Sequence, residues 1–210
     1  MTREEQKEHT KRKILDNALT EFAERGYGGS SVNHIYDPAQ GISKGLLYHY
    51  FSTKDEMFLA CVEECFARLK EHIHSSLSAA PVPHTIRDCL GRYYGARMEF
   101  FRQYPRYQRI FCEAAIMPPQ HLLNEIRLRR RPMEELNRSI LEAALSTAVL
   151  RDGLDTTEVA AVFIRFSNFM DAQFDPPHGA DAALDAYEAR SMELLDMFLY
   201  GVIKEEPADV

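Results

Sequence analysis

The sequence has few cysteines and no long apolar run. Its four cysteines in 210 residues are too few for a disulfide framework. The longest apolar runs fall far short of the roughly 20 residues that span a bilayer. Residues 1–15 are charged and polar, unlike a secretory signal. We therefore expect reduced thiols, no membrane span and a cytoplasmic location.

Motifs of common enzyme active sites are also missing. The sequence contains no nucleophile elbow, no zinc-protease helix motif, no phosphate-binding loop and no dinucleotide fingerprint. A helical enzyme is therefore the weaker alternative. We predict that the protein is not an enzyme and uses no cofactor and no metal.

Positive charge is concentrated in the first quarter of an acidic chain. The formal net charge is −7. Residues 1–54 nevertheless hold eight lysines and arginines against seven acidic residues, whereas the remainder holds seventeen against twenty-five. Because contact with phosphates needs local positive charge, we expect any nucleic-acid contact in this first quarter.

Apolar residues recur at steps of three and four along nearly the whole chain, which is typical of α-helices. We predict an all-α fold of about nine helices. Gly26 is expected to end the first helix in a left-handed conformation, and Ser31 and Ser43 are expected to cap the next two. The predicted helical segments are 4–25, 32–36, 43–50, 54–76, 81–104, 106–116, 120–130, 131–150, 156–174 and 179–203.

The first three helical segments follow the helix-turn-helix pattern, in which the second helix of the pair enters the DNA major groove. The stretches ILDNALTEFAERGY (14–27), SSVNHI (30–35) and ISKGLLYHYFSTKDEMF (42–58) closely resemble the signature of TetR-family regulators. The resemblance covers about residues 10–60. It implies an N-terminal helix-turn-helix domain (1–53), a ligand-binding and dimerisation domain (54–203) and a flexible tail (204–210).

The resemblance and the side-chain chemistry together predict the DNA contacts. Polar and basic groups at the start of the recognition helix suit phosphates, and its apolar and aromatic groups suit thymine methyls and sugars. The predicted contacts are Ser31, Ser43, Lys44, Gly45, Leu46, Tyr48, His49 and Lys54. An ordinary solvated surface is the alternative for each of them. The stretch after Ile35 departs from the family pattern, since it is one residue longer and carries Pro38.

The resemblance further implies a homodimer that binds a palindromic operator in double-stranded DNA. It is expected to act as a repressor that a small-molecule effector releases. The last two helices are expected to pair with those of the partner, through Val159, Val162, Phe163, Phe166, Met170, Leu195, Phe198 and Leu199. The predicted pocket is lined by Phe66, Tyr93, Tyr94, Arg97, Met98, Phe101, Phe111, Asn137, Leu141 and Phe166.

Several alternatives remain open at this point. Arg97 and Arg165 could anchor a ligand carboxylate, but an internal or cross-dimer salt bridge, for instance with Asp171, is the more common use of such an arginine. A thiol or metal sensor is another alternative, because Cys61 and Cys65 lie one helical turn apart on a helix that also carries His72. His72 lies about 10 Å further along that helix, which is too far for it to share one metal ion with the cysteines. The basic run 127–131 could contact a nucleic acid, but a solvated helix face is the simpler interpretation. A helical ligand-binding dimer that has lost operator binding is the second functional hypothesis, supported by the Pro38 stretch.

Overall fold

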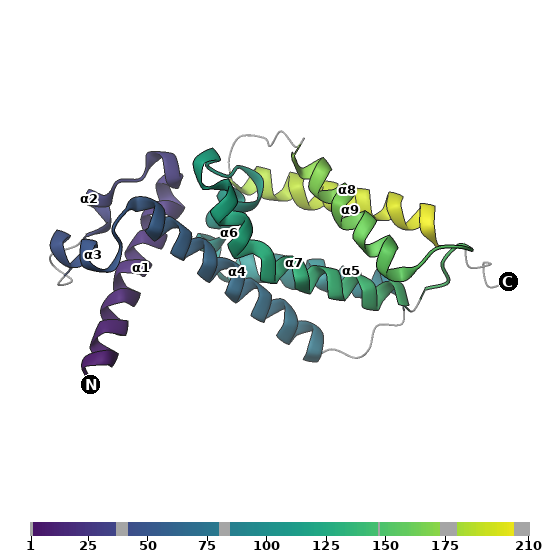
Figure 1. Cartoon of the computed structure of the whole chain (residues 1–210), viewed down its shortest axis with the longest axis horizontal. Coiled ribbons are helices and arrows are strands. Elements are labelled where there is room, and N and C mark those ends of the chain that lie inside the picture. Colours follow the sequence, from purple (N-terminus) through teal and green to yellow (C-terminus); the bar gives the residue numbers. More distant parts are fainter. Residues whose placement is uncertain (1, 37–41, 80–84, 147, 173–179, 204–210) are drawn as a thin grey trace. The chain divides into compact units, whose positions relative to one another are not determined.

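A computed structural model of the chain describes residues 2–36, 42–79, 85–146, 148–172 and 180–203 (Figure 1). Within these ranges the chain is helical, apart from turns and one isolated antiparallel bridge between Leu150 and Ile203. None of these helices is long and apolar enough to cross a membrane. The helices are α1 (Arg3–Gly29), α2 (Val32–Ile35), α3 (Lys44–Tyr50), α4 (Lys54–Ala79), α5 (Ile86–Gln103), α6 (Pro105–Phe111), α7 (Leu123–Ser146), α8 (Thr156–Ala172) and α9 (Ala180–Val202). The prediction of an all-α fold of about nine helices is confirmed.

The chain divides into two compact units. The first unit comprises Met1–Arg68 and Phe101–Arg131, and the second comprises Leu69–Phe100 and Pro132–Val210. This division follows compactness and does not test which residues form a functional domain. The domain boundary expected after residue 53 therefore stays a prediction.

The first unit is built around one face of α1. Ile14, Ala18 and Phe22 recur every four residues and are fully buried, as the apolar stripe of this helix predicts. Ile35 of α2 and Leu47 of α3 are fully buried as well. The two short helices are therefore anchored in the unit by one large apolar side chain each.

The two predicted serine caps are confirmed, but the predicted end of the first helix is wrong, because α1 continues past Gly26 to Gly29. Ser31 Oγ accepts a hydrogen bond from the Asn33 amide, and Ser43 Oγ accepts one from the Leu46 amide, so both serines cap helices. Gly26 has φ +69° and kinks α1 before its last turn. The segment that holds Pro38 lies outside the described residues.

Two expectations about the middle of the chain are wrong. Segments 120–130 and 131–150 were expected to be separate, but residues 123–146 form the single helix α7, with Pro132 inside it. Pro132 is exposed, and the buried residues Ile126 and Met133 keep one apolar face across it, so packing outweighs one lost hydrogen bond. Segment 106–116 is not uniformly α-helical, because a π-helical turn, η2 (Cys112–Ile116), follows α6.

The second unit packs α5, α7, α8 and α9 around an apolar core. α8 and α9 lie side by side, and the rings of Phe163 and Phe198 from these two helices lie 4.9 Å apart (Figure 1). The buried residues of this core are Leu90, Leu141, Leu145, Val159, Ala160 and Leu195.

Candidate nucleic-acid interface

Helix α3 has one buried face and one exposed face. Leu47 is fully buried, and Phe51 after the helix is buried too. Lys44, Gly45, Tyr48 and His49 are exposed, and their spacing places them on one side of the helix. Four of the eight predicted DNA contacts thus share one surface. Of the others on α3, Leu46 is half-buried and Ser43 uses its hydroxyl as the cap.

The exposed face of α3 continues onto the first turn of α2. Lys44 Nζ donates a hydrogen bond to Asn33 Oδ1 at 3.2 Å, and both side chains are exposed. The Asn33 amide nitrogen keeps both its hydrogens for another partner. The sequence analysis did not select Asn33. Its position could have indicated it, because it is a polar residue in the first turn of the helix that precedes the recognition helix.

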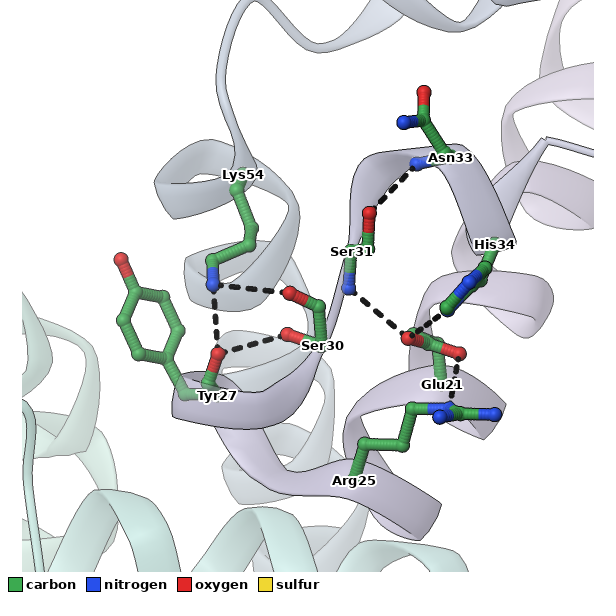
Figure 2. Close-up of polar contacts among 8 residues, drawn as sticks. All are labelled: Glu21, Arg25, Tyr27, Ser30, Ser31, Asn33, His34 and Lys54. Carbon is green, nitrogen blue, oxygen red and sulfur yellow. Dashed lines mark hydrogen bonds and ion pairs between the residues drawn. The ribbon is translucent and has the colours of Figure 1, made fainter.

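A buried carboxylate on α1 holds the first turn of α2 (Figure 2). Glu21 is 6% exposed, and its Oε1 accepts the Ser31 amide hydrogen at 3.0 Å and lies 3.0 Å from His34 Nδ1. Arg25 Nε lies 3.3 Å from the second oxygen. Burial alone would raise the pKa of Glu21, but the Ser31 amide, His34 and Arg25 together hold it below its usual range. Glu21 is therefore a carboxylate, and sequence reasoning missed both it and His34.

Lys54 lies against the last turn of α1 (Figure 2). Its ammonium donates to the carbonyl oxygens of Tyr27 at 2.7 Å and Ser30 at 3.3 Å, and it lies 4.3 Å from the centre of the Tyr27 ring. A cation in this position satisfies the carbonyl groups at a helix C-terminus. The geometry gives Lys54 a structural partner inside the unit, and its role as a phosphate contact stays a prediction.

The corner that leads from α1 into α2 is also held by η2. Glu113 Oε2 accepts the Tyr27 amide hydrogen at 2.6 Å, and Glu113 also pairs with Arg109 at 3.1 Å. The Tyr27 hydroxyl donates to Asp55 and lies 3.0 Å from His121 Nε2. Burial and the contact with Asp55 raise the pKa of Tyr27 to about 12. The corner that leads from α1 into α2 is thus fixed by Asp55 of α4, Glu113 of η2 and His121.

The predicted dimer residues divide into buried and exposed sets. Val159 and Leu195 belong to the core of the second unit, and the partly buried Phe163, Phe198 and Leu199 pack against that core. Val162 and Phe166 are 42% and 40% exposed. The Met170 side chain lies outside the described residues. Met192, Met197 and Tyr200 of α9 are exposed apolar side chains as well.

The predicted pocket residues belong to two different clusters. In the first unit, the buried rings of Phe66 and Phe101 pack against Phe111, with ring centres 6.0 and 5.0 Å away. In the second unit, Leu141 is part of the apolar core, Met98 is half-buried and Phe166 is exposed. The ten predicted pocket residues are therefore divided between the two units.

The remaining pocket residues form a polar network in the second unit. Tyr93 donates its hydroxyl hydrogen to Asn137 at 2.8 Å, and Arg97 Nη1 donates to the Tyr93 hydroxyl at 3.3 Å. Arg97 is buried, forms a salt bridge with the equally buried Glu188, and faces the rings of Tyr93 and Tyr94. The expectation that Arg97 has an internal salt bridge is confirmed, and Glu188 is the partner that sequence reasoning missed.

The four cysteines are free thiols. Cys61, Cys65 and Cys112 are buried, and burial raises the pKa of the Cys61 and Cys65 thiols. Such thiols stay protonated and unreactive. Within the described ranges, no three histidine, cysteine or acidic side chains are placed to hold a metal ion.

Residues 14–61 match the model of the family described as bacterial regulatory proteins, tetR family. Over 56 residues the chain is 41% identical to the biofilm operon icaADBC HTH-type negative transcriptional regulator IcaR of Staphylococcus epidermidis, covering 27% of this chain and 30% of that protein. Over 65 residues it is 37% identical to the HTH-type transcriptional repressor AcnR of Corynebacterium efficiens, covering 31% and 34%. The match spans about a third of the length of these relatives.

The similarity of fold extends over the whole chain. A TetR-family transcriptional regulator of Pectobacterium atrosepticum superposes with a TM-score of 0.62 at 20% sequence identity, covering 99% of this chain and 100% of that one. The order of the helices is therefore that of a known fold. At this identity the similarity concerns the fold and not the ligand or the operator.

Proposed function

Because residues 14–61 match the model of the tetR family of bacterial regulatory proteins, we propose that this protein is a cytoplasmic, sequence-specific DNA-binding transcription regulator of that family. It acts as a homodimer on a palindromic operator and represses until a small-molecule effector releases it. It is not an enzyme. The observation that carries the proposal is the exposed surface formed by Lys44, Gly45, Tyr48 and His49 of α3 with Asn33 of α2.

The glycine at position 45 is further support for contact between α3 and a partner outside the protein. A glycine inside a helix costs about 1 kcal/mol relative to alanine. A Cβ built at Gly45 would meet no atom within 4 Å, so packing within the described residues does not call for a glycine here. Close approach of the backbone to a DNA groove would explain it. The neighbours Lys44 and Tyr48 then reach phosphate oxygens and base edges on either side.

The apolar surface of α8 and α9 supports dimerisation. Val162, Phe166, Met192, Met197 and Tyr200 are each at least 40% exposed. A second copy of the chain would cover these side chains by forming a four-helix interface. Dimerisation also suits the function, because two recognition helices must lie about 34 Å apart to read a palindrome. In this reading residues 1–53 bind DNA and residues 54–203 dimerise and bind the effector.

The polar network of the second unit supports effector binding. Tyr93, Asn137, Arg97 and Glu188 place hydrogen-bonding groups among aromatic rings, a combination that recurs in small-molecule sites. The residues predicted to line the pocket and present in this network are Tyr93, Tyr94, Arg97 and Asn137. The alternative of a dimer without operator binding rests on the Pro38 stretch, which lies outside the described residues.

The test is selection of bound sequences from a random duplex library by the purified protein, at two salt concentrations. We expect a palindromic consensus. Lys44→Ala should abolish the enrichment or reduce the slope of log affinity against log salt by about one. Lys70→Ala on α4, outside the helix-turn-helix, is the matched control and should leave the consensus unchanged. Weak binding without a consensus would refute the proposal.

A further inference from the structure

His34 has one nitrogen bound inside the protein and one exposed to solvent. Its Nδ1 lies 3.0 Å from Glu21 Oε1, and its side chain is 52% exposed. Because Glu21 is a carboxylate, it can only accept a hydrogen bond, so His34 Nδ1 must carry the hydrogen. The exposed Nε2 is then a lone pair in the neutral ring and an N–H donor in the protonated ring.

His34 lies beside the surface proposed to bind DNA. It follows Asn33, whose side chain accepts the hydrogen bond from Lys44 at the start of α3. Ser31, at the start of the same short helix, is held by the same Glu21 oxygen. The charged group that contacts the imidazole is Glu21 of α1, which also pairs with Arg25. Lys44 of α3 contacts Asn33, the residue that precedes His34.

These contacts determine which protonation state suits DNA. A neutral His34 would turn its Nε2 lone pair toward the phosphate oxygens, which are acceptors themselves. A protonated His34 would donate from Nε2 to phosphate while Nδ1 stays bound to Glu21. The negative charge of the phosphates favours the positive ring. DNA binding would therefore be accompanied by the uptake of one proton by each His34.

We infer that His34 is a DNA-backbone contact whose protonation is coupled to DNA binding, and that Glu21 is the positioning residue that aims it. The inference rests on the proposed function, since it assigns a further contact to the same surface. It requires that affinity for DNA increases as the pH falls through the range in which imidazoles titrate. It also requires net proton uptake on binding, up to about two protons per dimer.

The experiment measures binding of the full protein to its selected duplex by fluorescence anisotropy from pH 6 to pH 8, at constant ionic strength. We expect the wild type to bind at least about tenfold more tightly at the lower pH. His34→Gln keeps a neutral donor and should bind with little dependence on pH. Glu21→Gln still accepts the Ser31 amide but removes the charge that holds the imidazole, so binding at the lower pH should weaken towards that of His34→Gln.

Two further variants separate His34 from other histidines. His49→Gln removes the imidazole on α3, and in this background the dependence on pH should persist. His74→Gln on α4 is the matched control outside the interface. Calorimetry in two buffers of different ionisation enthalpy counts the protons taken up, and we expect that number to fall towards zero in His34→Gln.

The possible results distinguish a failure of the inference about His34 from a failure of the proposed function. Affinity that depends on pH in His34→Gln as it does in the wild type would overturn the inference, as would a dependence lost only in His49→Gln. Wild-type binding that is equal at both pH values would also overturn it, while the proposed function would stand. Failure of the wild type to bind any duplex at any pH would refute the proposed function itself.

Discussion

Gly26 is the position at which a single methyl group should be most costly. Its φ of +69° with ψ of 169° lies in a region that only glycine occupies readily. A Cβ there would lie 2.3 Å from Glu113 Oε1 and 2.7 Å from Arg109 Nη2, both too close for real contacts. Gly26→Ala would therefore force the Glu113 carboxylate away from the Tyr27 amide that donates to it.

The magnitude follows from these two effects. An alanine in this backbone region costs about 1–3 kcal/mol. Separating a buried carboxylate from its amide donor costs about 1–3 kcal/mol more. Partial adjustment of Glu113 and Arg109 offsets part of the clash. We expect Gly26→Ala to lower the free energy of unfolding by about 2–5 kcal/mol.

The assay is urea unfolding of the full protein, followed by circular dichroism. Gly28→Ala is the matched control, because Gly28 lies two residues away, has no positive φ, and a Cβ there would meet nothing within 4 Å. That variant should be about 0.4–1 kcal/mol more stable than the wild type. Adding Glu113→Ala to Gly26→Ala removes the clash, so the double variant should lose less than the sum of the two single losses. A Gly26→Ala protein as stable as Gly28→Ala would refute the reasoning.

Two further predictions concern buried groups. The buried thiols should not react with an aromatic disulfide reagent at pH 8 until the protein unfolds, and fast labelling of more than one thiol per chain would contradict the burial of Cys61, Cys65 and Cys112. Glu188→Ala removes the carboxylate beside the buried guanidinium of Arg97, and it should lower the free energy of unfolding by about 3–5 kcal/mol. Glu193→Ala, an exposed position on the same helix, should change stability by less than about 0.5 kcal/mol in the same urea titration.

The sequence predicts the features of this fold that depend on near neighbours. Ser31 and Ser43 cap helices through amides two or three residues away, and Gly26 ends a regular stripe of apolar residues. The identity of each residue and the pattern beside it contain the information. The exposed face of α3 is equally readable, since the buried Leu47 fixes which side of the helix looks outward.

The carboxylates that hold the structure together were not predictable in this way. Glu21, Glu113 and Glu188 each look like solvated surface residues in the sequence. Their partners lie 10, 86 and 91 residues away along the chain. A buried acidic residue differs from an exposed one only by its tertiary surroundings. The predicted division between segments 120–130 and 131–150 is wrong for a related reason, because the apolar face of α7 continues across Pro132.

The corner between α1 and α2 shows why the predicted DNA-contact set needs residues beyond the helix-turn-helix. Lys54 holds the carbonyl groups of Tyr27 and Ser30, and Glu113 holds the Tyr27 amide, so charges of opposite sign fix one short stretch of backbone. Ser31 follows directly and starts α2. The position of the first turn of α2 therefore depends on α4 and η2, which lie outside residues 1–53. Even with the predicted boundary after residue 53, the geometry of the proposed DNA contact would depend on Lys54 and Glu113, which lie beyond it.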